Sequence, residues 1–315
     1  MRRLLLFTCA CAIAAGTAAC NRQAGTDGGR PRVALVLKTL NNPFFIEMQR
    51  GAEEAAKTLG VDLVVQAAER ETDVDKQMQI IENLIQAKVG ALAVTPSGSR
   101  EVVPAIVKAN QANIPVVVVD TRLDEKAAAD AGVKTASFVG SDNYRGGQLI
   151  GEYLVKASGG KARVAILEGI AGHETGDSRV RGFRDAVKGS PAITIAASQT
   201  ANWERDQGFN VFQNILQANP DIDTVFACND MMALGAIEAI NAAGRAGKIR
   251  VLGFDAVKDA RAALESGAMA ATVAQYPDEM GKAAVEMAVK AMKGEAVQAD
   301  VGVRIGLVTR ENAAK

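Results

Sequence analysis

The sequence has little of what reactive chemistry usually needs: it holds one histidine and four cysteines among 315 residues. One imidazole leaves no metal-ligand spacing, and the chain lacks the G-x-S-x-G elbow of serine hydrolases. It also lacks a phosphate-binding Gly-Lys-Ser/Thr loop and a G-x-G-x-x-G motif opening a helix. We therefore expect no bound metal, no cofactor, no energy-coupling step and no enzymatic activity.

The chain also lacks an excess of charge of either sign. Lysine and arginine together number 36, as do aspartate and glutamate. Nucleic-acid binding requires a basic patch, so no nucleic-acid partner is predicted. With 48% hydrophobic and 23% charged residues, the chain has the composition of a soluble protein with one large or two medium domains. Aromatic residues make up only 4%, which makes their positions informative.

No hydrophobic run is long enough to span a membrane, but the N-terminus carries a short one. A basic start precedes the apolar stretch LLLFTCACAIAAGTAA, so residues 1–20 are predicted to be a signal peptide. Small residues before Cys20 favour lipidation of that cysteine, although Thr17 replaces the usual leucine, and plain cleavage after Ala19 is the alternative. A lipid would tether the protein in the periplasm without spanning the membrane. Residues 21–31 are polar and glycine-rich, as expected of a flexible linker.

Beyond Pro31, short apolar runs alternate with amphipathic segments of helical length. The ten runs are RVALVL, VDLVVQA, ALAVTP, IPVVVVD, ASFVGSD, RVAILEG, ITIAASQ, TVFACND, IRVLGFD and MAATVAQ. Runs without strict polar alternation indicate strands buried on both faces of parallel sheets. Ten strands exceed one comfortable sheet, so we predict two doubly wound parallel-sheet α/β domains joined by a multi-strand hinge. The predicted lobes are residues 32–140 plus 276–302 and residues 141–275 plus 303–315.

Polar residues follow most of these strands, and ligands of open α/β sheets bind at the carboxyl ends of strands. Amides, carboxylates and cations at such ends can hydrogen-bond the hydroxyls of a sugar or cyclic polyol, and aromatic rings can cover its C–H faces. A ligand between the two lobes is therefore expected. The predicted ligand-binding residues are Lys38, Asn42, Phe44, Phe45, Asp120, Thr121, Arg179, Trp203, Asn229, Asp255 and Gln275.

Taken one at a time, these residues have simpler explanations. Asp120 and Asp255 could each cap the helix that follows, and Asn42 before Pro43 is a good N-cap. Phe45 continues the buried face of a helix, whereas Phe44 lies off that face. Arg179 could be a solvated surface residue, and His173 in a glycine-rich loop is expected to be solvated rather than functional. The hypothesis rests on the convergence of these residues.

The ordered segments KTLNNPFF, KANQANIPVVVVD, ILEGIAG, FACNDMMALGAI, VLGFDA and ATVAQ make the chain resemble the bacterial periplasmic binding proteins of the ribose- and allose-binding group. The resemblance runs from about Arg32 to about Arg310. It implies sugar-hydroxyl contacts for Asn42, Asp120, Arg179, Asn229, Asp255 and Gln275. It also implies stacking by Phe44, Phe45 and Trp203.

Two departures from the ribose-binding pattern bear on specificity. Thr121 stands where ribose binders have arginine, with Arg122 one residue late. Lys38 stands where they have a small hydroxyl residue and where the allose-like binders have lysine. A hexopyranose or cyclic polyol is therefore at least as good a candidate as ribose.

The resemblance implies a monomeric solute-binding protein that closes around its sugar and delivers it to the permease of an ABC importer. A chemoreceptor is a further possible partner. The alternatives are a sensor-only binding protein for a sugar or furanosyl signal, a carbohydrate-active enzyme using paired carboxylates, and a repressor. The repressor would need a helix-turn-helix head where this sequence has a signal peptide and linker.

Overall fold

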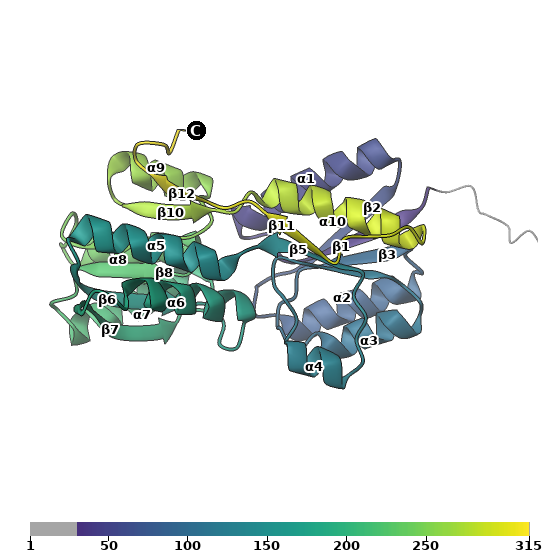
Figure 1. The fold of residues 1–315 in the computed structure, drawn as a ribbon, viewed down its shortest axis with the longest axis horizontal. Helices are drawn as coiled ribbons and strands as arrows, with labels where there is room; N and C mark the ends of the chain where they lie inside the picture. The colour runs from purple at the N-terminus through teal and green to yellow at the C-terminus, as the bar shows by residue number, and fades with distance from the viewer. Residues whose placement is uncertain (1–29, 315) are drawn as a thin grey trace, which may run out of the picture. The chain divides into compact units, whose positions relative to one another are not determined.

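The computed structural model describes residues 30–314, and from Pro31 onward the chain forms one compact unit. Within this part of the chain, two six-stranded sheets carry the architecture (Figure 1). The strands of the first sheet are β1 (Arg32–Thr39), β2 (Asp62–Ala68), β3 (Ala91–Val94), β4 (Val116–Val119), β5 (Ser137–Ser141) and β11 (Asp300–Val303). Its helices are α1 (Pro43–Leu59), α2 (Val74–Gln86), α3 (Val103–Gln111), α4 (Glu125–Asp130) and α10 (Pro277–Met292).

The second sheet and its helices follow the same plan. Its strands are β6 (Lys161–Glu168), β7 (Ala192–Thr200), β8 (Thr224–Ala227), β9 (Arg250–Leu252), β10 (Ala271–Ala274) and β12 (Gly306–Thr309). The accompanying helices are α5 (Asn143–Ser158), α6 (Glu174–Val187), α7 (Arg205–Ala218), α8 (Asp230–Ala242) and α9 (Lys258–Ser266). We call the parts built on the two sheets the first lobe and the second lobe.

The sheet orders confirm the predicted α/β class with two doubly wound sheets. The first sheet runs β11-β5-β4-β3-β1-β2 and the second runs β12-β10-β9-β8-β6-β7. Neighbouring strands pair in parallel except for β12, which pairs antiparallel with β10. Every one of the ten apolar runs forms a strand, and β11 and β12 are the two strands that the runs did not predict.

Burial explains why the central strands lack polar alternation. In β1, β3, β4 and β8, side chains on both faces are buried because helices cover each side of the sheet. In the first lobe, α1 and α10 lie on one face and α2 and α3 on the other (Figure 1). The strands are thereby fixed, and their carboxyl ends present the loops that carry the site.

The chain passes between the sheets at three places. It crosses after β5 at Ser141, after β10 at Ala274, and between β11 and β12 from Val303 to Gly306. Each lobe is therefore assembled from separate stretches of sequence. None of the helices within residues 30–314 is long and apolar enough to cross a membrane.

Three pairs of helices pack closely because each partner has a glycine facing the other's backbone. A Cβ on Gly51 of α1 would lie 1.9 Å from the Asp278 carbonyl oxygen, and one on Gly281 of α10 would lie 1.9 Å from that of Met48. Gly147 and Gly182 serve the α5–α6 pair in the same way, and Gly208 and Gly235 serve the α7–α8 pair. Only glycine permits backbones this close.

Candidate functional site: a polar cavity between two sheets

A cavity with about 260 Å³ of empty space lies where loops from both sheets meet. The side chains around it come from strand ends, loops and helices of both lobes. They are Lys38, Asn42, Phe44, Phe45, Glu71, Asp120, Thr175, Arg179, Trp203, Asn229, Asp255 and Gln275.

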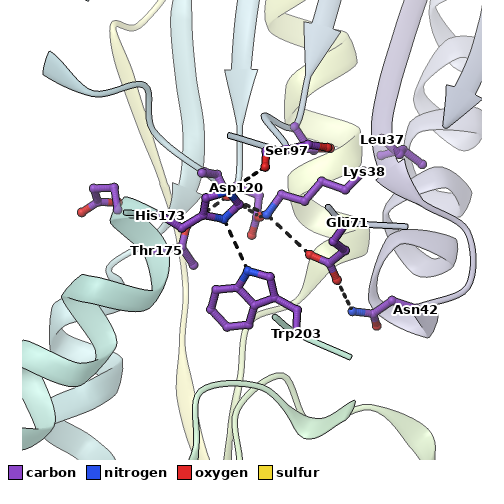
Figure 2. A network of polar contacts seen from close by, with 12 residues as sticks. Leu37, Lys38, Asn42, Glu71, Ser97, Asp120, His173, Thr175 and Trp203 are labelled. Carbon is purple, nitrogen blue, oxygen red and sulfur yellow. Dashed lines mark hydrogen bonds and ion pairs between the residues drawn. The ribbon is translucent and has the colours of Figure 1, made fainter. Parts of the chain in front are cut away.

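Lys38 is the centre of the first lobe's polar groups. Its ammonium donates to Thr121 Oγ1 at 2.8 Å and to Asp120 Oδ2 at 3.3 Å, and it lies 3.8 Å from Glu71 Oε2. Figure 2 shows its side chain reaching from the end of β1 between the two carboxylates. The cation thus holds two acceptor side chains at the cavity while all three remain buried.

Asn42 confirms the capping interpretation and also does more. Its Oδ1 accepts from the Phe44 amide at 3.1 Å, which caps α1, while its Nδ2 donates to Glu71 Oε1 at 3.0 Å. Helix α1 then presents Phe44 and Phe45, whose rings meet edge to face with centroids 5.3 Å apart. Both phenylalanines are buried and both line the cavity.

Glu71 was not among the predicted site residues. Burial raises the pKa of its carboxyl to about 7, against the opposing influence of Lys38 and the hydrogen bond from Asn42. It sits three residues past the end of β2 within the polar run ERETD, which reads as solvated surface. Glu71 was missed because it does not directly follow the apolar run of β2. The pairing of β2 with β1, which brings the loops after both strands together, was the signal that could have found it.

Arg179 occupies the second lobe's side of the cavity and is buried, not solvated. Its Nε donates to Asn143 Oδ1 at 2.9 Å and its Nη1 to the Cys228 carbonyl at 2.7 Å. The guanidinium carbon lies 3.8 Å from the Phe254 ring centroid and 5.6 Å from that of Trp203. The arginine is therefore held in one orientation from several sides.

Asp255 and Gln275 form a second group of acceptors. Gln275 Nε2 donates to Asp255 Oδ1 at 2.6 Å, and Arg179 Nη1 lies 3.7 Å from the same oxygen. Burial raises the pKa of Asp255 well above its usual range, and Arg179 opposes that rise. Gln275 Oε1 is buried without a hydrogen-bond partner within residues 30–314. A buried acceptor in this state is available to a hydrogen-bond donor of a bound ligand.

Trp203 and Asn229 complete the second lobe's wall. Asn229 caps α8 by accepting from the Met232 amide at 2.9 Å, and its Nδ2 donates to the Trp203 carbonyl at 3.0 Å. The indole ring packs so closely over Gly169 that a Cβ there would lie 1.9 Å from a ring carbon. Gly169 ends the ILEG run, and its lack of a side chain makes room for the ring.

The start of α6 touches the first lobe through consecutive residues. His173 Nε2 lies 2.6 Å from the Ser97 carbonyl, and the Glu174 amide donates to Ser99 Oγ at 3.3 Å. Thr175 Oγ1 lies 3.0 Å from Thr121 Oγ1. His173 is 1% exposed, so the expectation of a solvated histidine was wrong: the ring is enclosed between the lobes.

Of the predicted site residues within the described part of the chain, all except Thr121 line the cavity. Thr121 lies one step back, bonded to Lys38 and Thr175. Arg122 points elsewhere, paired with Asp300 at 2.6 Å and stacked on Phe138 at 3.6 Å. The capping alternative for Asp120 and Asp255 was wrong, because Asp124 and Val257 are the N-cap residues of α4 and α9. The predicted lipidation site, Cys20, lies outside the described residues.

The cavity offers mainly hydrogen-bond acceptors, two fixed cations and aromatic walls. Carboxylates and the free amide oxygen accept from hydroxyls, while Lys38 and Arg179 donate. Such a set suits a small neutral molecule with many hydroxyl groups and apolar C–H faces. Within residues 30–314, no group of three or more histidine, cysteine or acidic side chains is arranged to hold a metal ion.

Comparison with known proteins places the chain in a family. The model of the periplasmic binding protein domain matches residues 33–296. The ribose import binding protein RbsB of Escherichia coli (strain K12) is 39% identical over 311 residues, covering 99% of each chain. The D-allose-binding periplasmic protein of the same strain is 36% identical over 277 residues, covering 87% of this chain and 89% of its own.

Solved structures agree with this assignment. A periplasmic solute binding protein of an ABC transporter from Actinobacillus succinogenes 130z, with bound D-allose, is 42% identical with a TM-score of 0.84. The match covers 90% of this chain and 99% of that one. A solute binding protein from Bacillus halodurans C-125 with bound myo-inositol is 30% identical, with a TM-score of 0.82 over 92% and 98% of the chains.

Proposed function

The chain belongs to the periplasmic binding protein family, and we propose that it captures a neutral monosaccharide or cyclic polyol and delivers it to an ABC importer. The observation that carries this proposal is the cavity itself. Polar and aromatic side chains from both lobes surround a space for one small ligand, and Gln275 Oε1 has no partner within residues 30–314. The protein is periplasmic, as its family implies.

Capture works by closure of two lobes, residues 32–140 plus 276–302 and residues 141–275 plus 303–315. A ligand held by Asp120 and Lys38 from one lobe and by Arg179 and Asp255 from the other favours the state in which these groups surround it. Thr121 and Thr175 meet across the cleft, as expected for the closed state. The permease then recognises that state and receives the ligand.

The local chemistry makes a hexopyranose or a cyclic polyol at least as good a candidate as ribose. Lys38 lies beside two carboxylates at one end of the cavity, and Thr121 stands where the ribose-binding pattern has an arginine. Arg122 is held outside by Asp300 and Phe138. Relatives described as binding D-allose and myo-inositol show that this family accepts such ligands.

The experiment is a titration of the purified protein with allose, ribose, glucose, galactose, xylose, fructose and myo-inositol. Trp203 is the chain's single tryptophan and lines the cavity, so binding changes the fluorescence. Melting is followed in parallel, because ligand at about a hundredfold over its Kd adds about 2.7 kcal/mol of stability. No response to any of these ligands in either assay would refute the proposal.

The site acts without chemical conversion of its ligand. Incubation with the bound sugar should return that sugar unchanged, and detection of a product would instead support a carbohydrate-active enzyme. A sensor-only role feeding a chemoreceptor or sensor kinase shares the same cavity. Uptake of labelled sugar that disappears on deletion of the gene distinguishes transport from sensing.

The N-terminal cysteine adds a tether to this scheme. A lipid on Cys20 holds the monomeric protein at the membrane. A Cys20→Ser variant should move from the membrane fraction to the soluble periplasmic fraction. Equal distribution of the variant and the original protein would favour simple cleavage of the signal.

A further inference from the structure

We propose that His173 is a positioning residue that fixes the indole of Trp203 and bridges the two lobes in the ligand-bound state. This proposal rests on the proposed function, because it assigns to His173 a role in regulating ligand binding in the same cavity. His173 does not line the cavity itself, but its ring lies between the Trp203 indole and Ser97 of the first lobe (Figure 2).

The hydrogen bonds define which form of the imidazole is present. The Ser97 carbonyl can only accept, so Nε2, at 2.6 Å, must carry a hydrogen. Nδ1 then accepts from Trp203 Nε1–H at 3.4 Å. A neutral ring satisfies both neighbours at once, and its location at the N-cap of α6 without a capping bond leaves the side chain available for this task.

Two further contacts between the lobes lie directly beside the histidine. Glu174 and Thr175 follow it directly and contact Ser99 and Thr121 of the first lobe. Thr121 in turn accepts from Lys38, which holds Asp120 at the cavity. Residues 173–175 therefore connect the contact between the lobes to cavity-lining groups of both: Trp203 in the second lobe and, through Thr121 and Lys38, Asp120 in the first.

Protonation would break this arrangement. An imidazolium carries hydrogens on both nitrogens, so its Nδ1–H would face the Trp203 Nε1–H. Burial lowers the pKa of His173 to about 4, with Lys38 acting in the same direction and the Ser97 bond and Asp120 opposing. On the side of the second lobe, Arg179 lies 5.6 Å from the Trp203 ring. In an open form the ring would regain water and a pKa nearer about 6.5.

The direction of the pH effect follows from these two states. Because closure lowers the pKa, closing releases a proton between about pH 4 and pH 6.5, and acid favours the open form. Ligand affinity should therefore fall as pH decreases through this window. For pKa values of about 4 and 6.5, the loss from pH 7.5 to pH 5 reaches about 30-fold.

The test compares His173→Gln and His173→Ala with the unmodified protein, using D-allose and D-ribose as probes in calorimetry at pH 5 and 7.5. Glutamine can donate to Ser97 and accept from Trp203 but does not titrate, so it should keep the affinity at pH 7.5 within about threefold. It should also remove the extra loss at pH 5. Alanine should weaken binding about tenfold or more at pH 7.5. Glu71 and Asp255 are unchanged throughout, so their titration cancels in the comparison.

A second readout requires no sugar. The single tryptophan gives one indole N–H signal in a proton–nitrogen correlation spectrum, and that signal should titrate with pH in the unmodified protein and not in His173→Gln. The proposal would be overturned if His173→Ala bound the sugar as tightly as the original protein. It would also be overturned if the indole N–H signal changed neither with pH nor on substitution of His173. If neither probe binds the original protein, the proposed function fails for these sugars, and the indole titration alone decides the role of His173.

Discussion

At the scale of single residues, three cavity-lining side chains stand on backbone with positive φ. Asp120, Trp203 and Asp255 have φ values of 63°, 68° and 122°. Non-glycine residues rarely adopt such values, which cost of order 1 kcal/mol or more each. Asp120 and Asp255 follow strand ends and Trp203 follows β7. The unusual backbone redirects the chain there so that these side chains face the cavity.

Asp120→Asn is predicted to weaken sugar binding by about 1–3 kcal/mol, or roughly tenfold to hundredfold in Kd. Asparagine keeps the size of the side chain and tolerates positive φ, but it removes the charge beside Lys38 and one acceptor. Calorimetric titration measures the change. Asp130→Asn, on the exposed face of α4, is the matched control and should bind like the original. Equal binding by Asp120→Asn would remove Asp120 from the site.

Glu71→Gln is predicted to change how stability depends on pH. The folded-state pKa of Glu71 is raised to about 7 by burial, so the stability of its protonated form is fully present below about pH 4.5 and is lost as pH rises through 7. The glutamine variant has no such loss. Its unfolding free energy relative to the original should rise by up to about 3 kcal/mol between pH 4.5 and 8. Urea titrations measure the unfolding free energy of both proteins at each pH. A constant difference between the two proteins from pH 4.5 to pH 8 would contradict this prediction.

The sequence predicted those site residues that directly follow apolar runs or belong to the recognised motifs. Asp120, Asn229, Asp255 and Gln275 are examples, because parallel strands bring their carboxyl ends to one edge. Glu71 and Thr175 were missed because longer loops carry them back to the cavity, and loop paths are not encoded in apolar periodicity. His173 was misjudged because a glycine-rich loop predicts exposure, whereas contact with the other lobe encloses it.

At the scale of elements, helix pairs joined through facing glycines set the position of the binding groups. Gly147 of α5 faces the backbone of Arg179 on α6, and Asn143 at the start of α5 accepts from the Arg179 side chain. The position of the guanidinium therefore depends on how closely these two helices approach. A change in the spacing of α5 and α6 would therefore move the Arg179 guanidinium at the cavity.

Gly182→Ala is predicted to destabilise the fold by about 1–3 kcal/mol and to weaken sugar binding as well. The added methyl would lie 2.0 Å from the Tyr144 carbonyl oxygen, so α6 must move away from α5 and carry Arg179 with it. Thermal melting and calorimetry measure the two effects. Gly189→Ala, where no atom lies within 4 Å of the added carbon, is the control and should change neither. Equal melting temperatures for the two variants would contradict close packing.

Strands were predicted where apolar residues follow one another and missed where they do not. The apolar runs revealed β1 through β10, including the largely half-buried edge strands β2 and β7, because all ten are rich in Val, Ile, Leu and Ala. Strands β11 and β12 read DVGV and GLVT and are largely half-buried or exposed at sheet edges. Their place depends on pairing with β5 and β10, which a local pattern does not encode.

At the scale of the whole molecule, closure should be detectable as proximity of the two lobes. A protein with Thr121→Cys, Thr175→Cys and Cys20→Ser is predicted to form a disulfide several times faster with saturating sugar than without it. The two threonine oxygens lie 3.0 Å apart across the cleft. Cys228 does not compete, because burial raises the pKa of its thiol to about 12. Each single cysteine variant is the control, and a rate that ignores sugar would argue against closure on binding.

The order of strands also determines when each lobe can be completed during synthesis. The first sheet is closed at one edge by β11 and the second by β12, and both follow residue 299. Helix α10, which covers one face of the first sheet, is made just before them (Figure 1). When only the first 270 residues have been made, the first sheet lacks β11 and the second lacks β10 and β12. Folding of either lobe to completion must therefore wait until the residues of its edge strand, 300–303 for the first lobe and 306–309 for the second, have been made.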